Sequence, residues 1–117
     1  MNDYGIENKN VISQGESSVL LEFFISEKSV YFDGHFPSFK LLPAVAQLDI
    51  ISRFADKYFS CGCFAREIRR IKFVSPVFPN TLVRLSLSFD KNKTCISFVF
   101  FRAEDASKVF CQGSYYL

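Results

Sequence analysis

Alternating apolar and polar residues in the second half of the chain predict β-strands. From Val83 to Phe89 every second residue is apolar and the residues between are Arg or Ser, as in a strand that buries one face. Short polar turns at 90–93 and 103–107 favour antiparallel pairing of the strands beside them. In all, five segments are expected to be strands: 18–25, 65–74, 82–89, 94–102 and 109–117.

The segment 41–59 predicts one long α-helix. Pro43 suits the first helical position, and no Gly or Pro interrupts the residues that follow it; Gly62 is expected to help end the helix. Apolar residues point in most directions around its axis, which is typical of a buried helix. One strand before and four after the helix predict an α+β fold with an antiparallel sheet wrapped around it.

Composition limits the range of functions. The 117 residues are 49% hydrophobic and support a single domain spanning 1–117, with a loosely ordered polar arm at 1–15. A net charge of +2 is too small to indicate nucleic-acid binding. The longest apolar runs are too short to span a bilayer and the polar start lacks a signal peptide, so no membrane association is expected.

The four cysteines, at 61, 63, 95 and 111, lack a His at ligand spacing. Reduced thiols in a cytoplasmic protein are therefore favoured over a metal site or disulfides, with two of them packed as small hydrophobic residues.

Candidate chemistry is concentrated in one stretch. His35 is the sole histidine and lies in a loop, and Asp49 follows fourteen residues later within the apolar helix. An ionised carboxylate is costly to bury, so Asp49 is expected to be neutral, to have a partner or to face a cavity. The amides of Ala44 and Val45 lie in the first helical turn, where backbone donors lack intrahelical partners.

These residues carry a resemblance. Gly34-His35-Phe36-Pro37, then Leu42-Pro43 and Gln47-Leu48-Asp49, resemble the active-site segment of hotdog-fold 3-hydroxyacyl-(acyl carrier protein) dehydratases, most closely the subgroup of aryl-polyene gene clusters (ApeI-like). The resemblance implies a hotdog domain that works as a dimer. It implies no cofactor or metal, because the proton transfers need only two side chains and a polarised carbonyl.

The resemblance also implies a mechanism. His35 would take the α-proton of a 3-hydroxyacyl thioester, and Asp49 would protonate the leaving hydroxyl. The Ala44 amide would hold the thioester oxygen, and Gly34, Phe36, Pro43 and Val45 complete the implied substrate site. The setting would be fatty-acid or aryl-polyene biosynthesis. Ala44 and Lys40 depart from the family's Gly and Pro and put the substrate fit in question.

Several alternatives stay open. Arg53 stands four residues after Asp49, at the spacing of an ion pair that would hold the carboxylate ionised. Gln47 is either an ordinary polar residue or one that orients Asp49. The cationic cluster Arg66, Arg69, Arg70 and Lys72 is either a solvated strand face or a dock for an acidic acyl carrier protein or a phosphopantetheine phosphate.

Other functions compete with dehydration. A hotdog thioesterase would use Asp49 to activate water or attack the carbonyl. A non-catalytic hotdog subunit would bind acyl carriers or complete a heterodimer, although a homodimer is the simpler expectation.

Overall fold

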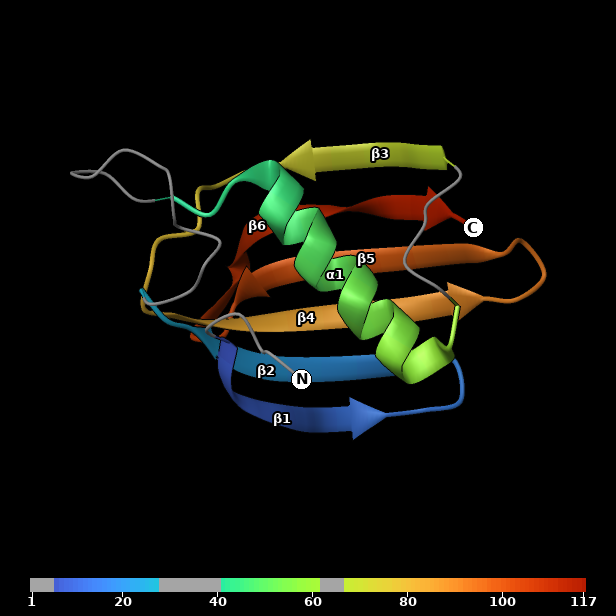
Figure 1. The fold of residues 1–117 in the computed structure, drawn as a ribbon, viewed down its shortest axis with the longest axis horizontal. Coiled ribbons are helices and arrows are strands. Elements are labelled where there is room, and N and C mark those ends of the chain that lie inside the picture. Colours follow the sequence, from blue (N-terminus) through green and yellow to red (C-terminus); the bar gives the residue numbers. More distant parts are fainter. Residues whose placement is uncertain (1–5, 28–40, 62–66) are drawn as a thin grey trace.

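The computed structural model describes residues 6–27, 41–61 and 67–117. In this part of the chain one helix packs against one face of a six-stranded antiparallel sheet, whose order is β1-β2-β4-β5-β6-β3 (Figure 1). The elements are β1 (Ile6–Gln14), β2 (Ser18–Ile25), α1 (Ala44–Phe59), β3 (Glu67–Phe73), β4 (Thr81–Asp90), β5 (Cys95–Arg102) and β6 (Asp105–Tyr116).

The core lies between α1 and the inner face of the sheet. Alternate residues of β2, β4 and β5 point toward the helix, because successive side chains of a strand face opposite sides. Aromatic rings join the layers: the Phe23 and Phe54 ring centroids are 4.9 Å apart, and those of Phe59 and Phe89 are 5.5 Å apart. The helix on an antiparallel sheet is the arrangement that the hotdog resemblance predicts.

One strand was missed by the sequence pattern. Residues 6–14, expected to be part of a loosely ordered arm, form β1 and pair antiparallel with β2. The expectation was wrong because β1 is an edge strand and is mostly polar; Ile6 is its buried apolar residue, whereas Val11 and Ile12 are largely exposed. Backbone pairing to β2 orders this segment where side-chain burial is sparse.

The second predicted turn is shorter than expected. Arg102 of β5 pairs with Asp105 of β6, so Ala103 and Glu104 alone connect the strands. Residues 105–108 are exposed at the end of the hairpin, and a strand segment with no buried face shows no alternating pattern.

Both helix ends differ slightly from the sequence prediction. Pro43 is the N-cap residue, with extended backbone angles (φ −68°, ψ 159°), and Ala44 is the first helical residue. Ser60 ends the helix in the left-handed conformation, and its amide donates to the Asp56 carbonyl at 2.8 Å. The end therefore comes two residues before Gly62, which lies outside the described residues.

The helix is not buried on all sides within the single chain. Ala46, Ile50, Ile51 and Ala55 are buried against the sheet, whereas Val45 on the opposite side is 79% exposed. The sheet covers one side of α1, and the described residues leave Val45 on the other side uncovered.

Within the described residues, Cys61, Cys95 and Cys111 form no disulfide. Cys95 and Cys111 are free and buried in the core. Burial raises the pKa of the Cys111 thiol to about 12, so this thiol stays protonated at neutral pH and behaves as a small hydrophobic side chain. Cys63 lies outside the described residues.

Candidate active site

Asp49 lies on the outward face of α1, in its second turn. Its side chain is 38% exposed, and its Oδ2 accepts a hydrogen bond from Arg53 Nε at 2.9 Å. The spacing of four residues brings the two side chains together on one side of the helix. The ion pair that the sequence left open as an alternative is therefore present.

The ion pair bears on chemistry more than on stability. The Arg53 side chain is 41% exposed, and a pair this open to solvent typically contributes only about 0–1 kcal/mol to folding. A cation bound to a carboxylate nevertheless favours the ionised form. The structure therefore shows the Arg53 guanidinium as a direct partner of the Asp49 carboxyl group.

The start of α1 presents backbone donors close to Asp49. Pro43 supplies no side-chain cap, the first turn contains no acidic residue, and the Gln47 amide donates to the Pro43 carbonyl at 3.0 Å. The amides of Ala44 and Val45 precede that bond, at the positive end of the helix dipole. Val45 and Asp49 are one turn apart, so the donors and the carboxylate belong to the same outward region.

The segment that leads into the helix is fixed from two sides. The Leu42 amide donates to the Val77 carbonyl at 2.8 Å, and the Gln47 Nε2 donates to the Leu42 carbonyl at 3.1 Å. Gln47 is 4% exposed and points into the molecule, away from Asp49. Gln47 thus binds the backbone ahead of the helix, and the hypothesis that it orients Asp49 is wrong.

Part of the predicted site lies outside the described residues. Gly34, His35, Phe36 and Lys40 belong to that part. The pairing of His35 with Asp49 stays a prediction.

The cationic cluster lies on the outer face of the sheet, at the edge strand β3. Arg69 and Lys72 are in register with Ser114 and Gln112 of β6, and register partners share a face. Arg69 is already engaged: its Nε and Nη2 bind Glu67 at 2.8 and 3.1 Å, and these bonds raise its pKa. Arg66 lies outside the described residues.

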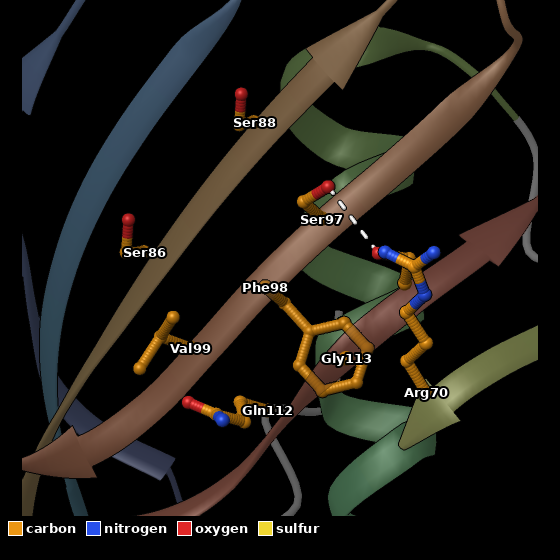
Figure 2. A pocket seen from close by; sticks show the side chains of 9 residues that line it. Arg70, Ser86, Ser88, Ser97, Phe98, Val99, Gln112 and Gly113 are labelled. Atoms are coloured by element: carbon orange, nitrogen blue, oxygen red, sulfur yellow. Dashed lines mark hydrogen bonds between the residues drawn. The ribbon is translucent and has the colours of Figure 1, made fainter.

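A backbone irregularity turns Arg70 toward a shallow groove of about 390 Å³. The register of β3 and β6 shifts between Arg69 and Lys72, and Arg70 has a positive φ of 58°. Gly113 permits this close approach, because a Cβ there would lie 2.9 Å from the Ile71 Cα. Figure 2 shows the Arg70 side chain extending over the groove, which is lined mainly by Ser86, Ser88, Ser97, Val99, Gln112 and Ser114.

The groove and Asp49 lie on opposite sides of the sheet. The groove-lining residues of β4 and β5 alternate with the residues that bury their side chains beneath α1. Arg70 and Asp49 therefore do not form one site within this chain.

No metal centre or membrane span emerges from the described ranges. Residues 6–27, 41–61 and 67–117 contain no group of three His, Cys, Asp or Glu side chains placed to hold a metal ion. Over these same residues, no helix has both the length and the apolar character needed to cross a bilayer.

Solved structures share this fold. The dehydratase heterocomplex ApeI:P from Xenorhabdus doucetiae matches with a TM-score of 0.76 at 23% identity, over 93% of this chain and 96% of that one. An uncharacterized protein from Erwinia carotovora subsp. atroseptica matches with a TM-score of 0.76 at 26% identity, over 95% and 90%. Mouse (Mus musculus) thioesterase superfamily member 2 matches with a TM-score of 0.67 at 13% identity, over 95% and 79%.

These matches confirm the hotdog fold. Among curated proteins, none matches the sequence significantly. The model of the ApeI-like family, described as ApeI dehydratase, matches residues 11–114 and thus nearly the whole chain. The chain is therefore a member of the ApeI-like dehydratase family.

Proposed function

We propose that the chain dehydrates 3-hydroxyacyl thioesters carried on an acyl carrier protein and releases trans-2-enoyl thioesters. His35 takes the α-proton, since a neutral imidazole is available near pH 7. The thioester oxygen gains enolate charge, and Asp49 gives a proton to the departing hydroxyl so that water leaves. The proposed setting is fatty-acid or aryl-polyene biosynthesis.

One observation carries this proposal: an uncapped helix start stands one turn before a carboxyl group on the same side of α1. The Ala44 amide is suited to hold the thioester oxygen, because it lies at the positive helix end. Donors of this kind typically contribute about 3–4 kcal/mol to the transition state. The Ala44 side chain is exposed, so its Cβ lies at the surface where the thioester would approach.

The open outward face of α1 favours a site shared by two subunits. Asp49 is partly exposed, and Val45 beside it is largely exposed. We place His35 of the partner subunit opposite this face, in a homodimer or in a heterodimer. The Xenorhabdus structure is described as a heterocomplex, and sedimentation of the purified chain tests whether it associates with itself.

The acidic acyl carrier protein is proposed to dock on the outer cations of β3. Arg70 and Lys72 are exposed, whereas Arg69 is already bound by Glu67. Charge reversal of Arg70 and Lys72 together is expected to weaken carrier binding in low salt and to have little effect in high salt. Unchanged carrier binding in low salt would remove this surface from the proposal.

Dehydration itself is tested with the purified protein and a 3-hydroxyacyl thioester on its carrier. The expected result is new absorbance from a conjugated enoyl thioester, lost in His35→Ala. Undiminished activity in His35→Ala would remove the assigned base. If the wild-type chain is inactive alone and with a candidate partner subunit, the proposed function fails.

A second candidate function is thioester hydrolysis, which the Arg53–Asp49 ion pair favours. An ionised carboxylate is the form that activates water or attacks a carbonyl, whereas dehydration needs a protonated one. Release of free carrier thiol without enoyl absorbance would select this function.

A further inference from the structure

Gln47 is an unusual residue for its position. It lies on the inner face of α1 and is 4% exposed, among apolar neighbours that include Ala46 and Ile50. Its Nε2 donates to the Leu42 carbonyl at 3.1 Å. Its Oε1 is buried and has no hydrogen-bond partner within the part of the chain that the structure describes. The Nε2 of Gln47 thus has a partner, whereas its Oε1, a buried acceptor unsatisfied among the described residues, lowers the free energy of unfolding.

The hydrogen bond from Gln47 Nε2 holds the backbone just before the proposed oxyanion donors. The Leu42 amide is held by the Val77 carbonyl, and the Leu42 carbonyl is held by Gln47. The next residue is Pro43, whose ring fixes φ near −65° and whose observed φ is −68°. With residue 42 held at both ends, φ of Pro43 fixed and the Pro43 carbonyl held by the Gln47 backbone amide, little freedom remains in the peptide that carries the Ala44 amide.

We propose that Gln47 is a positioning residue, which aims the Ala44 amide at the thioester oxygen by holding the Leu42 carbonyl. This inference rests on the proposed function for its catalytic consequence. Gln47 does not touch the substrate; it acts through Leu42 and Pro43. The helix start has no side-chain cap, so this buried bond takes the place of a cap in setting the direction of the first turn.

Gln47→Met separates positioning from packing. Methionine is of similar length and removes both amide atoms, which relieves the unsatisfied Oε1 but leaves the Leu42 carbonyl without its donor. The two effects oppose each other, so the melting temperature is expected to change by no more than about 4 °C. The kcat for dehydration is expected to fall about 10- to 100-fold, with KM changed less than about threefold, because a misdirected donor is felt mainly in the transition state.

Gln47→Glu is expected to make the activity depend on pH in a way that a packing role would not. A protonated carboxyl group donates to the Leu42 carbonyl in place of Nε2, whereas an ionised one repels that carbonyl. Activity relative to wild type is therefore expected to be retained at low pH and lost as the introduced carboxyl ionises. Ile51→Val is the matched control on the same helix face, expected to lower stability modestly without this added pH limb.

A measurement independent of turnover separates this inference from the proposed function. Amide hydrogen exchange and amide NMR shifts of Ala44 and Val45 should change in Gln47→Met and remain as in wild type in Ile51→Val. If wild type makes no enoyl product but these amides respond, dehydration fails while the positioning role stands. The inference is overturned if the amides do not respond, if kcat in Gln47→Met stays within twofold of wild type, or if Gln47→Glu shows no added pH limb.

Discussion

The two faces of α1 differ in burial and in the kind of residue that they carry. On the inner face Phe54 packs on Phe23, and Ile51 and Ala55 are fully buried. On the outer face stand Val45, 79% exposed, and the Asp49–Arg53 ion pair. The inner face therefore stabilises the fold, whereas the outer face presents an ion pair and an apolar residue, Val45, that the described residues do not cover. Substitutions on the inner face should lower stability, and substitutions on the outer face should change the reaction rate or subunit association.

The largest expected effect comes from Asp49→Asn. The amide cannot supply the proton that the leaving hydroxyl needs, so the rate of dehydration should fall about 10²- to 10⁴-fold. Stability should change by no more than about 1 kcal/mol, because both side chains of the ion pair are partly exposed to solvent. Enoyl formation and thermal unfolding measure the two effects.

The control for that prediction is Asp56→Asn, the same chemical change two turns further along α1. It should leave turnover near the wild-type value. Full activity in Asp49→Asn would remove this carboxyl from the role of acid.

Phe54→Ala tests the inner face of α1 and should lower the free energy of unfolding but not the rate of dehydration. Removing a large buried ring leaves a cavity against Phe23 and typically costs about 3–5 kcal/mol. Urea denaturation measures the loss, and the rate per folded molecule should stay close to wild type. Phe54→Leu, which keeps much of the volume, should cost clearly less. A purely catalytic defect in Phe54→Ala would contradict the division between the faces.

How far the sequence predicts the sheet depends on burial. Strand β4 was predicted to within one residue at each end, because its side chains alternate between core and outer face. Strand β1 escaped notice, because an edge strand is ordered by backbone pairing with β2 and leaves little alternation to detect. The charged start of β6 escaped for the same reason.

The candidate site shows a similar limit. Local spacing was enough to anticipate the Asp49–Arg53 pair, since i,i+4 side chains meet on any helix. The open face of α1 was predictable from Asp49, Arg53 and Asp56, which recur at helical spacing, although apolar residues elsewhere around the axis suggested burial on all sides. The bond from Gln47 to Leu42 depends on the path of the chain before the helix, and no periodic pattern encodes that path.

Val45→Lys tests whether the outer face is covered by a second subunit. In a single chain this exposed position should tolerate lysine within about 0.5 kcal/mol. In a subunit interface the introduced charge would be desolvated, and association should weaken about 10- to 100-fold. Sedimentation equilibrium measures the difference. Equal association of Val45→Lys and wild type would show that this part of the face is open in the assembly as well.

Arg53→Gln has the smallest expected effect and the sharpest chemical meaning. Loss of an exposed ion pair should change stability by no more than about 1 kcal/mol. Without the guanidinium the neighbouring carboxyl keeps its proton to higher pH, so proton donation should persist further into the alkaline range. Enoyl formation at neutral pH should rise by up to about fivefold, the equivalent of 1 kcal/mol, and thiol release by a carboxylate-dependent route should fall.

The ratio of enoyl product to free thiol in Arg53→Gln therefore separates the two chemistries that this helix face supports. High salt should also raise the ratio of enoyl product to free thiol in wild type, because it screens an exposed ion pair. Lys57→Gln in the last turn serves as the control for loss of positive charge on α1. A fall in enoyl formation in Arg53→Gln alone would mean that dehydration requires the paired carboxylate, and Asp49 would then act as a base and not as the acid.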